Sequence, residues 1–144
     1  MGELVLAATA LTRGRVTGEV LRSAVPISFW GGVGTDGVVV DAHHPLRGRS
    51  LSGRVLAMVS GRGSSSSSSV IAELLRTGQG PCAIVLAHPD PIIALGAIVA
   101  DELYAIATPV VVVPEADLVL LTGTVTVTSN PDAGTATVTR VSSS

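Results

Sequence analysis

The stretch of this chain best suited to chemistry is a run of six consecutive serines at 64–69. It follows Gly61-Arg62-Gly63 and lies between an apolar run at 55–59 and a helical pattern that begins at Val70. A Gly/Ser turn between a strand and a helix presents N–H groups and hydroxyls at the positive helix end, where anions and reactive oxygens are held. Ser64 or Ser65 would lie near the N-cap, a position that favours serine. Spacing alone leaves three interpretations open: flexible linker, capped turn and functional loop.

Two further motifs combine unusual residues. His43 and His44 are adjacent, but successive side chains of an extended backbone point apart, and the third histidine, His88, is remote in sequence. A structural role, a subunit interface and a substrate contact are therefore all favoured over a metal site. Phe29 and Trp30 stand beside two glycines, which is typical either of a plug at the end of a sheet or of a docking surface for a partner.

Several other kinds of chemistry are excluded or disfavoured. Cys82 is the one cysteine, so the chain can form neither an internal disulfide nor the cysteine ligation of an iron–sulfur cluster. The chain has no lysine, which rules out a phosphate loop that ends in Gly-Lys-Ser/Thr. A nucleophile elbow with matching acid and histidine is also missing. An enzyme built from these residues would need a second component.

The elements that must position these residues follow from the apolar pattern. Short segments separated by glycine-rich turns predict strands at 4–8, 17–21, 26–29, 38–40 and 54–59. The second half predicts a helix at 70–77 that ends at Gly78, a strand at 83–86, a helix at 91–105 capped by Asp90, a strand at 109–113, and a hairpin of 123–127 with 135–141. The prediction is one α/β domain over 1–144, with a barrel-like, β-rich first half and a strand–helix–strand second half.

Composition narrows the class of protein. Hydrophobic residues make up 47% of the 144 residues and charged residues 14%, which is enough for a substantial aliphatic core. A net charge of −2 and scattered arginines disfavour nucleic-acid binding. Charges and prolines interrupt every long apolar run, so we expect no membrane span and no secretory signal, and a cytoplasmic location.

Several motifs in order resemble one known family, the small subunit of the aconitase-X family. They are Ser-Phe-Trp-Gly-Gly-Val at 28–33, Asp-Ala-His-His-Pro-Leu-x-Gly at 41–48, and Gly-Arg-Gly-Ser-Ser-Ser at 61–66. Pro-Cys-Ala-Ile-Val-Leu at 81–86, the segment 90–99 and Glu-Leu-Tyr at 102–104 fit the same pattern. The resemblance runs from about residue 14 to 113, and the C-terminal hairpin lies outside it.

The resemblance implies a swivelling β/β/α domain that closes over a large subunit carrying an iron–sulfur cluster. In such enzymes the swivel domain contributes a serine, which as an alkoxide removes the proton α to a carboxylate. By motif position this serine is Ser64, with Ser65 as its rival. Arg62, Gly63 and Ser66 would then contact the substrate.

The same resemblance implies that Phe29, Trp30, His43 and His44 contact the large subunit, and that this chain itself binds no metal. Family members dehydrate cis-3-hydroxy-L-proline or, in an archaeal branch, 5-phosphomevalonate. The lysine-free composition favours the first, a small hydroxy acid. A non-catalytic assembly module and a self-contained ligand-binding domain stay open as alternatives.

Overall fold

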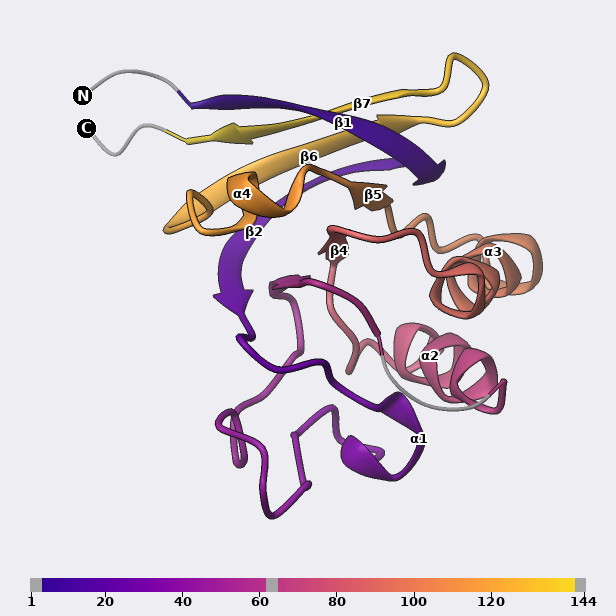
Figure 1. The fold of residues 1–144 in the computed structure, drawn as a ribbon. Coiled ribbons are helices and arrows are strands. Elements are labelled where there is room, and N and C mark those ends of the chain that lie inside the picture. Colours follow the sequence, from indigo (N-terminus) through magenta and orange to yellow (C-terminus); the bar gives the residue numbers. More distant parts are fainter. Residues whose placement is uncertain (1–3, 62–64, 142–144) are drawn as a thin grey trace.

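In a computed structural model that describes residues 4–61 and 65–141, the described strands close into a barrel in the order β1-β5-β4-β3-β2-β6-β7. The strands are β1 Val5–Thr12, β2 Gly14–Arg22, β3 Val55–Met58, β4 Ala83–Leu86, β5 Val110–Val112, β6 Thr124–Asn130 and β7 Thr135–Arg140. The helices are α1 Phe29–Gly32, α2 Ser67–Arg76, α3 Pro91–Tyr104 and α4 Glu115–Leu118. Figure 1 shows α2 and α3 stacked on one side of the barrel, away from the two chain ends.

The barrel is half parallel and half antiparallel. β2, β3, β4 and β5 pair in parallel, whereas β1, β6 and β7 join them by antiparallel pairs. Strands β3 and β4 are buried on both faces, as expected of parallel strands covered by helices. In β3 the side chains of Leu56 and Met58 pack toward the helices, while Val55 and Ala57 pack inside the barrel. This alternation divides the core into two clusters on either side of one sheet.

Helices α2 and α3 pack closely because the facing surface of α3 carries small residues. The buried residues of α3 are Ile93, Gly96, Ala97 and Ala100. A Cβ on Gly96 would lie 2.8 Å from both the Cβ of Ile71 and the carbonyl oxygen of Ser68 in α2. The larger apolar residues whose spacing predicted this helix, such as Leu95, Ile98 and Leu103, point to solvent instead.

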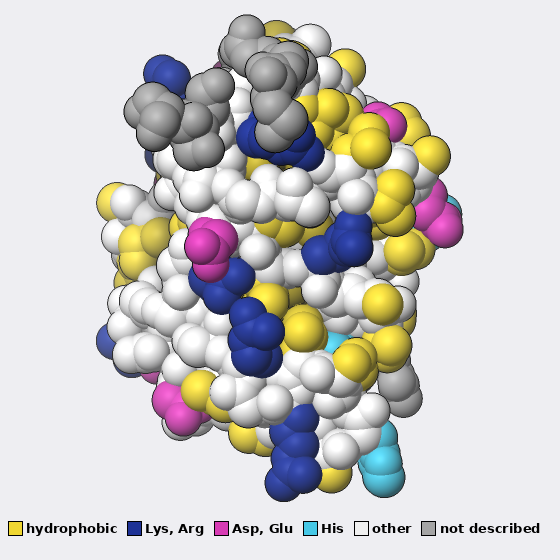
Figure 2. Space-filling model, turned by 90° about the vertical axis from the view of Figure 1, so that its left-hand side faces the viewer, with side chains coloured by type: hydrophobic (Ala, Val, Ile, Leu, Met, Phe, Trp, Pro, Cys, Tyr) yellow, Lys and Arg dark blue, Asp and Glu magenta, His cyan; other side chains and the backbone are white. Residues whose placement is uncertain are grey.

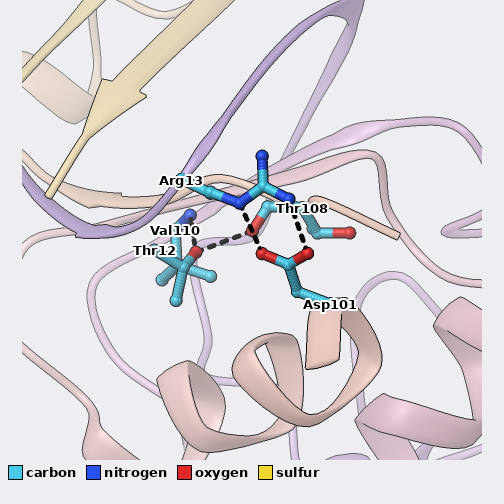
Figure 3. Close-up of polar contacts among 5 residues, drawn as sticks. All are labelled: Thr12, Arg13, Asp101, Thr108 and Val110. Carbon is cyan, nitrogen blue, oxygen red and sulfur yellow. Dashed lines mark hydrogen bonds and ion pairs between the residues drawn. The ribbon is translucent and has the colours of Figure 1, made fainter. Parts of the chain in front are cut away.

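A threonine side chain helps to close the barrel between β1 and β5. The register shifts between Ala10 and Thr12, which leaves a gap in the ladder. The Thr12 hydroxyl fills it by donating to the Thr108 carbonyl at 2.7 Å and accepting from the Val110 N–H at 2.7 Å. Next to it, Arg13 forms a two-bond ion pair with Asp101 of α3, at 2.8 Å for each bond (Figure 3).

The predicted fold class is confirmed, with three corrections. The barrel draws its strands from both halves of the chain and not from the first alone. The predicted strand at 26–29 is wrong because residues 29–32 turn into a short kinked helix, with Gly31 at a φ of 82°. The predicted strand at 38–40 is wrong because Val38 and Val39 form only isolated bridges. No helix in the described part of the chain is long and apolar enough to cross a membrane.

Candidate functional site

The described part of the serine run, residues 65–69, follows β3 in the chain and leads into α2. Ligands commonly bind at the carboxyl ends of the parallel strands in α/β folds. Ser65 and Ser66 form an exposed turn, and α2 begins at Ser67, three residues earlier than predicted. Half of the serine run is therefore helical, and the N-cap is Ser66, directly after Ser65. Arg62, Gly63 and Ser64, which include the first-ranked candidate base, lie outside the described residues.

The first turn of α2 carries no anion of its own. The N-cap Ser66 makes no side-chain capping bond, and no acidic residue lies in the first turn. The Ser67 hydroxyl is buried and has no hydrogen-bond partner in the described structure, whereas the Ser68 hydroxyl donates back to the Ser65 carbonyl at 2.9 Å. A buried hydroxyl without a partner costs about 1–3 kcal/mol, so a group that engaged it would bind with that advantage.

The neighbouring helix α3 shows the opposite arrangement. The carboxylate of its N-cap Asp90 accepts hydrogen bonds from the N–H groups of Ile92 at 3.0 Å and Ile93 at 3.1 Å. The positive end of α3 is thus already occupied by a negative charge, and the positive end of α2 is not. A Cβ on Gly61 would lie 2.6 Å from Asp90 Oδ2, so the chain entering the serine run passes directly against this cap.

The two aromatic candidates have different environments. Phe29 is 1% exposed and belongs to the core, whereas Trp30 is 61% exposed. The segment 29–35 and one face of α2 enclose a mostly apolar cavity of about 380 Å³, with Ser69 and Val70 among its lining residues. The structure therefore brings the aromatic motif next to the serine-bearing helix, with Trp30 free to contact another molecule.

The two histidines are also divided. His43 is exposed, whereas His44 is buried, with its Nδ1 accepting from the Leu46 N–H at 3.0 Å. Since Nδ1 accepts, the proton lies on Nε2, which faces the Val25 carbonyl at 3.1 Å and the Ser23 hydroxyl at 3.3 Å. The imidazole of His44 thus ties the 43–46 turn to the segment after β2. In the described residues, no group of three or more histidine, cysteine or acidic side chains is placed to hold a metal.

Cys82 lies away from these candidates. It is half-buried against Gly18, where a Cβ would come within 2.7 Å of its sulfur. Burial raises the pKa of the Cys82 thiol, which keeps it protonated at neutral pH and makes it a poor metal ligand. The cysteine is thus part of the packing between β2 and the start of β4.

Comparison with known proteins decides the family. The sequence profile of the aconitase X swivel domain matches residues 5–138. The chain belongs to this family. The crystal structure of Thermococcus kodakaraensis aconitase X in its holo-form superimposes with a TM-score of 0.77 at 33% identity, covering 94% of this chain and 98% of that one. The solution structure of a UPF0107 protein gives a TM-score of 0.75 at 34% identity over 92% of this chain and 97% of that one.

Two groups of curated relatives share this aconitase X swivel domain. The cis-3-hydroxy-L-proline dehydratase of Pseudomonas aeruginosa is 50% identical over 101 residues, which is 69% of this chain but only 17% of that protein. The small subunit of phosphomevalonate dehydratase from Methanothermobacter thermautotrophicus is 47% identical over 92 residues, covering 62% of this chain and 70% of the relative. The chain thus spans about a sixth of the first relative and most of the second.

Sequence reasoning missed two features at the carboxyl ends of the parallel strands, where the serine run lies. One is Ser67, which the pattern could not distinguish from its five serine neighbours. The other is a set of polar side chains at the carboxyl ends of the parallel strands: Arg22 ends β2, His88 follows β4 and Glu115 follows β5. Glu115 lies 3.7 Å from His88 Nε2 and lines a groove with Arg22. Counting residues beyond each predicted parallel strand would have grouped these three, because parallel strands end at the same edge of a sheet.

Proposed function

We propose that this chain is the swivel subunit of an aconitase-X-type dehydratase, which closes over a large catalytic partner and helps to eliminate water from a hydroxylated carboxylic acid. The observation that carries the proposal is the serine run, at the carboxyl end of β3 and at a helix end without an anion of its own. Membership of the aconitase X swivel family supports it. So do relatives named as dehydratases or as small subunits of one.

The proposed base is Ser64, with Ser65 as its rival. A serine hydroxyl is far too weak a base in water, and it becomes useful only in a closed site with positive groups aimed at its oxygen. The first turn of α2 supplies a positive helix end and the unpartnered Ser67 hydroxyl. The alkoxide would take the proton α to the carboxylate, and the resulting carbanion would break the carbon–oxygen bond to the β-hydroxyl group. That oxygen would become water by taking a proton from an acid of the large partner or from solvent.

The departing hydroxyl group needs an electrophile that this chain does not provide. Its single cysteine is half-buried, and its described residues hold no metal-binding group, so they do not fit an iron–sulfur cluster. We therefore assign the cluster implied by the family to the large partner. The residues of this chain bind, orient and deprotonate the substrate. Arg62, Gly63 and Ser66 are the proposed substrate contacts, with the Arg62 guanidinium suited to a carboxylate.

The substrate that we propose is cis-3-hydroxy-L-proline. The two hydroxyproline dehydratases are 50% and 43% identical to this chain over 101 and 110 residues. The phosphomevalonate dehydratase small subunits reach 47% over a shorter stretch of 92 residues. A phosphorylated substrate also favours additional cationic groups, and this chain has no lysine. Phosphomevalonate is the alternative substrate.

For the contact with the partner we propose Trp30 and His43, because both side chains are exposed. Trp30 also lines the cavity that Ser69 of α2 borders. Phe29 and His44 would contribute indirectly, because both side chains are buried and fix the backbone beside Trp30 and His43. The compartment that we propose is the cytoplasm.

The test uses the complex with the cognate large subunit, co-purified and with its cluster intact. Ser64→Ala and Ser65→Ala are assayed with cis-3-hydroxy-L-proline and with 5-phosphomevalonate, and Ser69→Ala is the matched control, since Ser69 is an exposed serine within α2. We expect one of the first two variants to lose at least about 100-fold in kcat while the complex stays assembled. Full activity in both variants would exclude a serine base at these positions.

A non-catalytic assembly module is the second candidate, favoured by the exposed Trp30 beside an apolar cavity. It predicts that Trp30→Ala disrupts the complex, while substitutions at 64–66 leave both assembly and turnover unchanged. The serine substitutions therefore separate the two candidates, since only the catalytic proposal predicts a loss of turnover in an assembled complex.

A further inference from the structure

A groove of about 520 Å³ lies between α4 and the segment that follows β2. Its floor is apolar, formed by Met58 and Val59 at the end of β3, and its walls include Arg22, Ala24, Ala116 and Val119. The groove is open to solvent and is separate from the cavity beside Trp30, with which it shares no lining residue.

Three large apolar side chains are exposed in the lining of this groove or next to it in sequence: Val119 lines it, Leu120 follows Val119, and Val25 follows the lining residue Ala24. Val119 is 64% exposed, Leu120 43% and Val25 38%. Figure 2 shows hydrophobic side chains gathered along its right-hand edge, which is the side that faces the viewer in Figure 1, where α4 lies in front of the barrel. Exposing three large apolar side chains beside an apolar groove is unfavourable in water. Their grouping therefore points to burial by another molecule.

The groove lies at the same end of the sheet as the serine run. Val59 lines the groove and stands two residues before Gly61, where the serine segment begins. The Val59 carbonyl accepts from the N–H groups of Ala87 at 2.9 Å and His88 at 3.1 Å, which fixes the end of β3 to the end of β4. A molecule seated in the groove would therefore contact the end of β3, which β4 holds in place and from which the chain continues toward the serine run.

Charges at the rim restrict the chemistry of that molecule. Arg22 is exposed, and among the described residues its hydrogen bond runs from Nη1 to the Val119 carbonyl at 2.8 Å. A guanidinium has five N–H donors, so most remain available for a carboxylate. Glu115, which also lines the groove, faces His88 Nε2 at 3.7 Å, so its charge already has a neighbour of its own.

We propose that this groove seats the large partner of the dehydratase, through an apolar side chain of the partner flanked by a carboxylate that meets Arg22. The proposal rests on the proposed function, because the serine must face the partner and the groove adjoins it. In the Pseudomonas aeruginosa relative this domain matches only 17% of the protein, so a far larger body is available to cover the surface.

The experiment measures the affinity of purified Val119→Glu and Arg22→Glu for the cognate large subunit by biolayer interferometry. Leu103→Glu is the matched control, because Leu103 is 67% exposed and lies on the outer face of α3. We expect Val119→Glu and Arg22→Glu each to weaken binding about 30-fold or more, as at an interface hot spot, and Leu103→Glu to change it less than about threefold. Unfolding of each isolated variant by urea shows that the fold is intact.

Near-normal binding by both groove variants, or an equal loss in Leu103→Glu, would overturn the proposal. Size-exclusion chromatography of the wild-type chain alone gives a further check, since a dimer broken by Val119→Glu would assign the groove to a second copy. Failure of the proposed function is a different result. In that case the assembled complex would not dehydrate either substrate, yet Val119→Glu would still weaken binding to the large subunit.

Discussion

Replacing Gly96 with alanine tests whether the packing of two helices sets the position of the serine segment. Gly96 lies in α3 against the first turns of α2, where an added Cβ would meet the Ser68 carbonyl oxygen and the Ile71 Cβ at 2.8 Å. Ordinary van der Waals contact begins at about 3.4 Å, so the two helices would have to separate by about 0.6 Å. The Ser68 oxygen belongs to the backbone and cannot rotate away, so the first turn of α2 must move.

Two opposing effects determine the change in stability. Overpacking of a tight contact costs about 1–3 kcal/mol, whereas alanine gains up to about 1 kcal/mol over glycine in helix propensity. The expected net loss is about 1 kcal/mol of unfolding free energy, or a fall in Tm of about 3–5 °C for a domain of this size. A displacement of 1 Å at a reacting group costs about 100-fold in rate, so a shift of about 0.6 Å predicts a loss of about tenfold in kcat.

Urea unfolding of the isolated domain and turnover of the assembled complex measure the two effects separately. Leu95→Ala is the control, because it changes the neighbouring residue on the exposed face of the same helix. We expect it to leave kcat unchanged. A Gly96→Ala variant as stable and as active as wild type would refute the reasoning, since it would show that helix propensity outweighs the contact and that α2 need not move.

Three other substitutions or reagents test separate parts of the structure. Thr12→Val should lower the unfolding free energy by about 2–4 kcal/mol in urea titrations, because the Thr108 carbonyl and the Val110 N–H both lose a buried partner. Ser67→Ala should leave the isolated domain equally stable or more stable by up to about 1 kcal/mol, yet raise KM in the complex, since its buried hydroxyl has no partner in the described structure. Cys82, whose raised pKa favours the protonated thiol, should react with iodoacetamide at pH 8 about tenfold more slowly in the folded domain than in urea, and equal rates would contradict its burial.

The sequence was most informative where a local pattern coincided with local hydrogen bonding. The strand at 83–86 and the Asp90 cap were predicted as observed. The ends of a short apolar run mark the ends of a strand, and a capping residue marks the start of a helix. The segments 26–29 and 38–40 are equally apolar, and Ile27, Phe29 and Val39 are indeed buried. They are not strands, because a ladder also requires a neighbouring strand in register, and that neighbour is set by the tertiary fold.

The sequence predicts which segment holds the candidate site, but it does not predict which serine begins helix α2. A run of identical serines contains no signal for where a helix begins. The rotational phase of α2 is set by its buried residues Ile71, Leu74 and Leu75, which belong to the core cluster shared with α3 and the sheet. The helix begins at Ser67, and the serine pattern does not indicate that boundary. For α3 the pattern gave the helix but not its buried face, because Gly96, Ala97 and Ala100 are too small to stand out beside Leu95 and Ile98.

The proposed function requires a domain with little chemistry of its own to take part in catalysis. A serine becomes a base only when positive groups hold its oxygen in a closed site, and closure is effective only if the serine returns to the same place each time. The interior of the domain meets this need through small residues between α2 and α3, the buried strands β3 and β4, and the Thr12 bridge of the barrel. Its rim, with Trp30 on one surface and the groove at α4 on another, leaves apolar groups exposed. A rigid interior keeps the serine segment in a fixed place within the domain, and an apolar rim provides surface that a partner can bind. With both features, contacts with the partner would set the position of the serine, and internal movement of the domain would not.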